Sequence, residues 1–157
     1  MAIHNTTSYI TPNQVIGYES GHSIGYSRES FDLDITGLTL ALVGQIFEVD
    51  HVAKTAKVID VPATVEDVEA LGDLGIFIGR DLPVNPIDPL NDYDRLSARK
   101  NGKIVCVVRG DQGMSVYKGA LAVGATKFYS LPADVRSALQ AKLTRENRFK
   151  VLDSSLV

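Results

Sequence analysis

The chain has 157 residues, of which 45% are hydrophobic and 22% charged, and this is typical of one globular domain rather than of a disordered or collagen-like chain. Its single cysteine, Cys106, cannot form an internal disulfide, so a secreted disulfide scaffold is excluded and a reducing compartment is expected. The net charge is −3, but residues 1–94 carry fifteen acids and four bases, whereas residues 95–157 carry four acids and twelve bases.

This uneven charge has two interpretations. Either the two halves interleave in one domain and neutralise each other, or they form a dipolar particle that docks through opposite faces on copies of itself or on a partner. The bases of the second half are scattered singly, so no direct nucleic-acid partner is expected. No apolar run approaches the roughly 18 residues of a membrane span. The N-terminus lacks the basic and apolar regions of a signal peptide, so neither a membrane partner nor secretion is expected.

Residues 1–37 are predicted to form an extended N-terminal arm. The segment is polar and is broken by four glycines and Pro12, yet it holds more apolar side chains than a plain disordered tail. Such an arm either packs loosely over its own domain or becomes ordered on another surface, where contact offsets the lost chain entropy. In the second case its anchors would be Tyr9, Ile10, Tyr18, Tyr26 and Phe31.

Residues 38–157 are predicted to form a single β-rich domain. Apolar alternation over 45–50 and the run at 57–61 predict a hairpin. Residues 64–71 are predicted to form a short helix, with Thr64 as N-cap and Asp67 completing a motif close to a capping box. The apolar run at 74–80 predicts a strand between glycines.

Residues 81–94 hold three prolines with acidic residues and asparagines beside them. Proline favours extended backbone, so this segment is predicted to be a stiff acidic loop. It is expected to contact a partner through Pro86, Asp88, Asp92 and Tyr93.

The runs at 103–110 and 114–119 predict two further strands. The tripeptide Arg109-Gly110-Asp111 is predicted to be a hairpin turn between them, with Gly110 supplying a positive φ, while an adhesion signal is the minor alternative. Cys106 lies between Val105 and Val107, which predicts a buried structural thiol rather than a nucleophile.

One longer helix is predicted at 131–145, between short strands at 127–130 and 148–153. Ser130 is expected to cap the helix, and Asp134 suits its N-terminal dipole. Val135, Leu139 and Leu143 recur at helical spacing on one face.

No recognised catalytic motif is present in the sequence. The three histidines, His4, His22 and His51, lack the short fixed spacing of metal ligands. The neighbouring carboxylates, Glu48 with Asp50 and the group Glu66, Asp67 and Glu69, are not expected to be buried as acid–base catalysis requires. We therefore expect no catalytic, cofactor-binding or metal-binding residue, and no enzyme activity.

The region from residue 74 to residue 130 resembles the head decoration (cement) proteins of tailed bacteriophages. In that family a pattern of glycines, β-branched residues and an arginine recurs. The matching residues are Gly75, Ile76, Gly79, Gly102, Val105, Val107, Arg109, Gly113, Val116, Gly124, Ala125 and Tyr129. The likeness covers about residues 38–153, and the helix at 131–145 and the long arm depart from the simplest members.

The resemblance implies a β-barrel or sandwich that binds the outer face of an assembled capsid. Its partners would be the major capsid protein and further copies of itself, as a dimer or trimer at symmetry axes. The protein would be made in the host cytoplasm and would end on the virion exterior. It would stabilise the shell without enzyme activity and without a cofactor.

The sequence thus predicts a mainly β protein, a small barrel or sandwich of hairpins with an inserted helix at 131–145, a short helix at 64–71 and an N-terminal arm. Other functions stay open beside capsid decoration. The chain would otherwise be another virion or tail component, a small adaptor module, or, less favoured, an enzyme with a site in the 81–102 loop.

Overall fold

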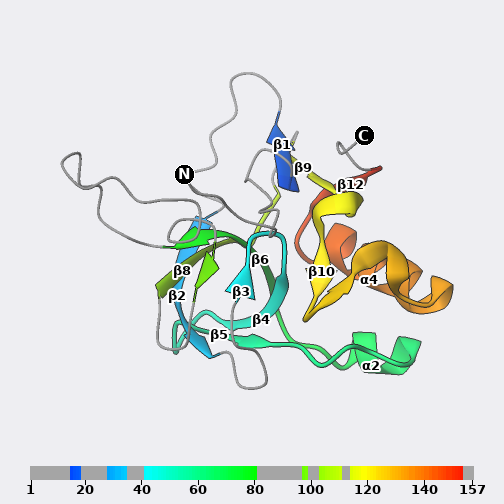
Figure 1. Ribbon diagram of the computed structural model, residues 1–157, viewed down its shortest axis with the longest axis horizontal. Coiled ribbons are helices and arrows are strands. Elements are labelled where there is room, and N and C mark those ends of the chain that lie inside the picture. Colours follow the sequence, from blue (N-terminus) through cyan, green and yellow to red (C-terminus); the bar gives the residue numbers. More distant parts are fainter. Residues whose placement is uncertain are drawn as a thin grey trace, which may run out of the picture.

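A computed structural model describes residues 15–18, 28–34, 41–80, 97–98, 103–110 and 114–153. The protein is mainly β, as the sequence predicts, and it is built on a closed five-stranded barrel with strand order β2-β5-β4-β6-β8 (Figure 1). The barrel strands are β2 (Arg28–Asp34), β4 (Ile46–Asp50), β5 (Thr55–Val58), β6 (Leu74–Arg80) and β8 (Lys103–Val107). Neighbouring strands are antiparallel except β2 and β5, which run parallel.

Strand β2 closes the barrel by pairing with both β5 and β8. Its residues alternate in the period of two that a half-buried strand requires, so Phe31 and Leu33 lie inside the barrel while Ser30 and Asp32 are exposed. The expected arm is therefore wrong for residues 28–34. Phe31 is 1% exposed in the core of its own domain and cannot anchor the chain to another surface.

A three-stranded sheet lies beside the barrel, with strand order β1-β9-β12. Its strands are β1 (Ile16–Tyr18), β9 (Met114–Tyr117) and β12 (Lys150–Leu152). Strand β9 pairs antiparallel with β1 and parallel with β12. Strands β8 and β9 thus belong to different sheets, and the predicted hairpin turn at Arg109-Gly110-Asp111 is wrong.

Short elements complete the layer beside the barrel. The hairpin of β10 (Ala122–Val123) and β11 (Thr126–Lys127) lies between two 3-10 turns, η2 (Lys118–Ala120) and η3 (Phe128–Ser130). A further pair joins β3 (Ala41–Leu42) to β7 (Ser97–Ala98). The strand predicted at 127–130 is thus a strand only at Lys127, because the following residues turn in η3.

The short helix α2 (Val65–Glu69) forms as its capping residues predict. Thr64 Oγ1 accepts a hydrogen bond of 3.2 Å from the Asp67 amide, and the Asp67 carboxylate accepts one of 3.2 Å from the Ala63 amide. This arrangement is close to a capping box, because two otherwise unpaired backbone donors are satisfied at once. Val68 is the buried residue of the helix.

The long helix α4 (Ala133–Arg145) buries Val135, Leu139 and Leu143, as the periodicity predicts. Its N-cap is Pro132 rather than Ser130, which lies in η3, so the predicted cap is wrong. The amide of Val135 is satisfied instead by Asp134 Oδ1 at 2.8 Å.

The barrel and the outer layer share one hydrophobic core, and two buried amide side chains join them. Gln45, at the start of β4, accepts from the Leu42 amide at 2.9 Å and donates to the Gly124 carbonyl at 2.7 Å. Asn147, after α4, donates to the carbonyls of Leu74 and Val108 at 2.7 and 2.8 Å. Buried amides are costly when unpaired, so these bonds fix how the two layers sit on each other. No helix in the described ranges is long and apolar enough to span a membrane.

Gly110 has a packing role rather than a turn role, since its φ is not positive. A β-carbon there would overlap the Phe149 ring and would lie 2.9 Å from Phe149 Cα and 3.0 Å from the Arg148 carbonyl oxygen. Gly110→Ala is expected to lower the free energy of unfolding by about 1–3 kcal/mol through overpacking. Urea denaturation measures this. Gly72→Ala is the control, because its β-carbon would meet only the flexible Glu48 side chain at 3.3 Å; equal losses in both variants would contradict the packing argument.

Cys106 is buried in β8 with no exposed surface, which confirms the expected structural thiol. Burial raises the pKa of this thiol, so the nucleophilic thiolate is suppressed. Cys106→Ser is expected to lower the free energy of unfolding by about 1–3 kcal/mol, because a hydroxyl replaces the thiol in an apolar core. Cys106→Ala separates this polar effect from simple loss of volume. Labelling of the native thiol as fast as that of a free cysteine would contradict its burial.

Candidate interaction site

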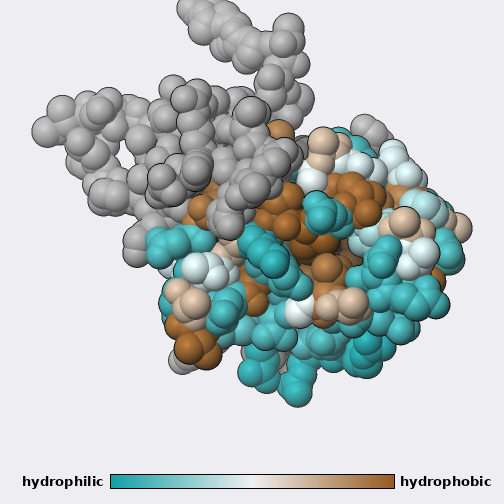
Figure 2. Space-filling view, turned by 90° about the horizontal axis from the view of Figure 1, so that it is seen from below, coloured by the Kyte–Doolittle hydropathy of each residue, from teal (hydrophilic) through white to brown (hydrophobic). Residues whose placement is uncertain are grey.

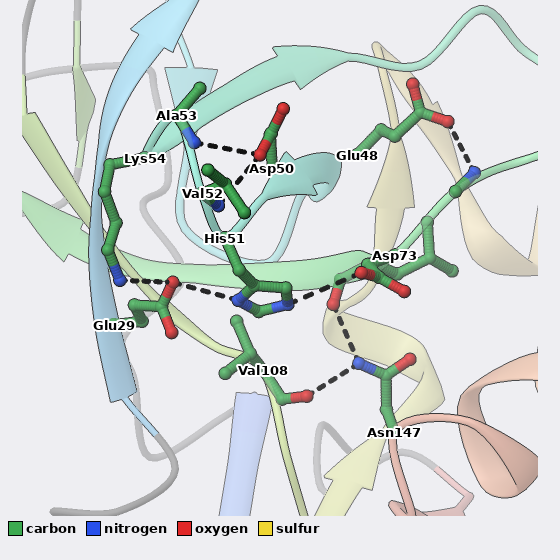
Figure 3. Close-up of polar contacts among 12 residues, drawn as sticks. Glu29, Glu48, Asp50, His51, Val52, Ala53, Lys54, Asp73, Val108 and Asn147 are labelled. Atoms are coloured by element: carbon green, nitrogen blue, oxygen red, sulfur yellow. Dashed lines mark hydrogen bonds and ion pairs between the residues drawn. The ribbon is translucent and has the colours of Figure 1, made fainter.

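Among the described residues, a polar cluster joins β2 to the turn between β4 and β5. Glu29 Oε2 accepts from His51 Nδ1 and from Lys54 Nζ, both at 2.9 Å. Figure 3 shows His51 between Glu29 and Asp73, whose Oδ2 lies 3.7 Å from His51 Nε2. The imidazole also packs edge-on against Phe31, with ring centroids 5.9 Å apart. The cluster therefore braces the parallel junction of β2 and β5 from outside.

The turn that presents His51 and Lys54 is built by Asp50. Its Oδ1 accepts from the amides of Val52 and Ala53 at 2.8 and 2.9 Å, and these bonds lower the pKa of Asp50. Lys54 then adopts a left-handed conformation with φ of 59°, which returns the chain into β5. Asp50 is thus occupied as a turn residue.

Glu48 has a separate structural role, so Glu48 and Asp50 do not work as a pair of carboxylates. Glu48 Oε2 accepts from the Gly72 amide at 2.6 Å, and Oε1 lies 3.5 Å from Lys57 Nζ. Figure 3 shows the two carboxylates engaged by different backbone segments. These contacts hold the segment before β6 against β4.

The charge on Glu29 depends on its partners. Partial burial raises the pKa of Glu29, but the hydrogen bonds from Lys54 and His51 outweigh that effect, and the pKa lies below its ordinary value. A carboxylate with a lowered pKa in the folded state stabilises the fold above its unfolded-state pKa. That contribution is lost as the pH falls through the lower, folded-state pKa.

A small polar cavity of about 110 Å³ lies between the barrel and the C-terminal end of α4. His51 and Asp73 line one side of it, and Lys142, Glu146 and Asn147 line the other. The Lys142 side chain is only 5% exposed, and its ammonium donates to Glu146 Oε2 at 2.6 Å. Acidic and basic side chains lie close together in this lining, so the cavity is a polar region between the two layers.

A larger groove of about 400 Å³ runs along β5 and α2. Its apolar surface comes from the end of β5, from the segment that links β5 to α2 and from Leu71 just after α2, and most of its charged residues are acidic. The lining residues are Glu48, Lys57, Val58, Ile59, Asp60, Val61, Pro62, Asp67 and Leu71. Figure 1 places β5 and α2 along the lower edge, and the face seen from below in Figure 2 has a hollow where hydrophobic side chains gather among hydrophilic ones.

The charge asymmetry of the sequence has a spatial counterpart. Residues 28–34 and 41–80, which form most of the barrel and α2, carry ten acids and four bases, a net charge of −6. Residues 114–153, which form the layer around α4 and β12, carry three acids and seven bases, a net charge of +4. The acidic excess and the basic excess thus belong to different strands and helices that share one core, although residues 103–110 add two bases to the barrel side and α2 packs against α4.

The sequence-predicted interaction residues are only partly placed. Phe31 is buried in the barrel, and Tyr18 lies in β1, whose backbone pairs with β9. The remaining predicted contacts lie outside the described residues: Tyr9, Ile10, Tyr26, Pro86, Asp88, Asp92 and Tyr93. In the described ranges, no group of three or more histidine, cysteine or acidic side chains is placed to hold a metal ion.

Sequence reasoning missed the groove. Its residues come from β4, β5, the linker and α2, and they meet only when the barrel closes. One local signal was available: after the strand, an acid and an apolar residue precede a proline in Asp60-Val61-Pro62, and proline disfavours a continued strand. Val61 is 45% exposed there.

Searches against protein-family models, curated proteins and solved structures find no match to this chain.

The Glu29 cluster makes a prediction about acid stability. Lowering the pH from about 7 to about 3 is expected to reduce the melting temperature of the wild type more than that of Glu29→Gln, which lacks the titrating carboxylate. Thermal melts followed by circular dichroism across this range measure the difference. Glu66→Gln is the control, since Glu66 is an exposed acid in α2 that lies outside this cluster. Parallel curves for wild type and Glu29→Gln would contradict the argument.

Proposed function

We propose that this chain is a non-enzymatic structural protein that attaches to the outer surface of an assembled phage capsid and stabilises it. The resemblance to head decoration proteins carries the proposal. Two stretches that hold many of the matching residues are far apart in the sequence but adjacent in the barrel. Ile76 pairs with Val107, and Gly79 pairs with Val105. This part of the likeness concerns one piece of structure, the paired strands β6 and β8. The matching residues from Val116 onward lie outside the barrel.

The glycines of this piece have packing reasons to be there. A β-carbon at Gly75 would lie 3.0 Å from Cys106 Cβ and 3.1 Å from Val49 Cγ1, so the β6–β8 pair needs a residue without a side chain. Gly79 has φ of 155° and lies where the β6–β8 register shifts. Such a bulge bends a strand and helps a small barrel to close. The resembling residues thus support a common barrel design.

Attachment to a capsid would use surfaces rather than a pocket. The segregated charges and the acidic groove offer weak, specific contacts, and a capsid repeats each contact by symmetry, so avidity compensates for low individual affinity. The N-terminal residues before β1 remain the proposed arm, with Tyr9 and Ile10 as its anchors. The loop residues Pro86, Asp88, Asp92 and Tyr93 remain proposed contacts.

The proposal is tested by mixing the purified chain with undecorated heads assembled from the capsid protein of the same genome. The expected result is saturable co-sedimentation with the heads and a higher melting temperature of the decorated shell. Unrelated particles of similar surface charge are the control. Absence of binding, or equal binding to the control particles, would overturn the proposal and favour an adaptor module.

The arm is tested by deleting residues 1–14, which leaves β1 and β2 intact; deleting residues 1–31 would instead remove the first half of β2 and open the barrel. Loss of Tyr9 and Ile10 is expected to weaken binding to heads by about tenfold or more, since burying one such side chain contributes about 1.5–3 kcal/mol. Tyr9→Ala with Ile10→Ala should reproduce the loss, whereas Thr6→Ala with Thr7→Ala should not. Unchanged affinity in the deletion would exclude the arm from attachment.

A further inference from the structure

We propose that the acidic groove along β5 and α2 receives the basic edge strand β12 of a second copy of this chain, in a head-to-tail contact. This contact rests on two surfaces of the chain itself. Only its role on a capsid rests on the proposed function.

The groove suits a strand that is both basic and apolar. Val58, Ile59 and Leu71 provide apolar contact area, and Val61 projects beside them with 45% of its surface exposed. Asp60 and Asp67 contribute negative charge to the rim. Lys57 is the basic residue in the lining, and it lies 3.5 Å from Glu48 Oε1, so its charge is compensated within the groove.

Strand β12 has the complementary chemistry. It lies at one edge of the sheet β1-β9-β12, and in the described part of the chain no strand pairs with its outer side. Strand edges present unpaired backbone donors and acceptors that favour further pairing. Along 148–152 the exposed side chains alternate with buried or half-buried ones, and they are Arg148, Lys150 and Leu152.

The two surfaces cannot meet within one copy. Figure 1 places β12 at the upper side of the molecule, whereas β5 and α2 lie along the lower edge. A contact between them therefore joins different copies and uses a different surface on each. Such a heterologous contact gives a ring when its rotation closes and a filament when it does not.

Opposite net charges favour a contact between the groove of one copy and β12 of another. The layer that contains β12 carries a net charge of +4, and the ranges that contain the groove carry −6. Complementary potentials speed encounter and disfavour like-with-like pairing, so groove-to-groove and edge-to-edge contacts are opposed. The contact should weaken as salt increases, because its charges lie at the surface.

The test uses two double variants that change exposed residues only. Asp60→Lys with Val61→Lys alters the groove, and Lys150→Glu with Leu152→Glu alters the edge strand. Val52→Glu with Lys127→Glu is the matched control, since both residues are exposed and lie outside the two surfaces. Circular dichroism checks that each variant is folded.

Sedimentation velocity over a range of concentrations gives the readout. The wild type and the control should associate with rising concentration and less so at higher salt. Each interface variant alone should associate at least tenfold more weakly. An equimolar mixture of the two variants should associate again, because the intact edge strand of one meets the intact groove of the other.

A monomeric wild type at every concentration would overturn the inference, and so would a mixture that stays monomeric or variants that associate like the wild type. Binding to heads is scored separately with the same variants. A monomeric chain that decorates heads would remove the self-contact and leave the proposed function standing. If the groove variant alone then failed on heads, the groove would be assigned to the capsid protein. Self-association of a chain that does not bind heads would support the self-contact and overturn the proposed function.

Discussion

Closure of the barrel through β2 is the constraint on which the rest of the fold depends. This strand pairs with β5 on one side and β8 on the other, so it converts four neighbouring strands into a ring. The parallel pairing with β5 covers only three residue pairs, and the contacts of Glu29 with His51 and Lys54 reinforce that side. Inside the ring, Phe31 and Leu33 complete the core. The outer layer can only pack on a barrel that is closed.

Hydrogen bonds from two buried amide side chains to backbone help to position the outer layer. Gln45 and Asn147 reach across the layer boundary to carbonyls of Gly124, Leu74 and Val108. Amide side chains of this kind have direction, so they select one orientation from the many that an apolar interface alone would allow.

Much of the fold follows from local patterns in the sequence. The hairpin of β4 and β5, the apolar strand β6, the capped helix α2, the face of α4 and the buried Cys106 all depend on residues close together in the chain. Strand β2 was missed because its alternation of Phe31 and Leu33 with polar residues lies in a segment rich in glycine and serine, which is typical of an arm. The alternation of side chains there favours a strand, whereas the composition favours an arm. Pairing with β5 and β8 makes the segment a strand.

The sheets to which β8 and β9 belong, and the shape of the groove, depend on contacts between residues far apart in the chain. Local sequence patterns do not predict such contacts. Two apolar runs separated by Arg109-Gly110-Asp111 are typical of a hairpin, yet β8 pairs with β2 and β6 while β9 pairs with β1 and β12. Between these strands, Gly110 packs closely against Phe149, a residue far along the chain. The charge of the groove could be read from the sequence, but its shape could not.

The parallel pairing of β9 with β12 has a consequence for the order of synthesis. On the ribosome, β9 emerges well before β12, with η2, the β10–β11 hairpin, η3 and α4 between them. Strand β12 is the last described element of the chain, so β9 cannot pair with it until α4 has also been synthesised. During translation the barrel can therefore close while the side of β9 that awaits β12 is still open. A chain paused at that stage exposes a strand edge in the outer layer, and that edge is where a nascent chain would need protection from its neighbours.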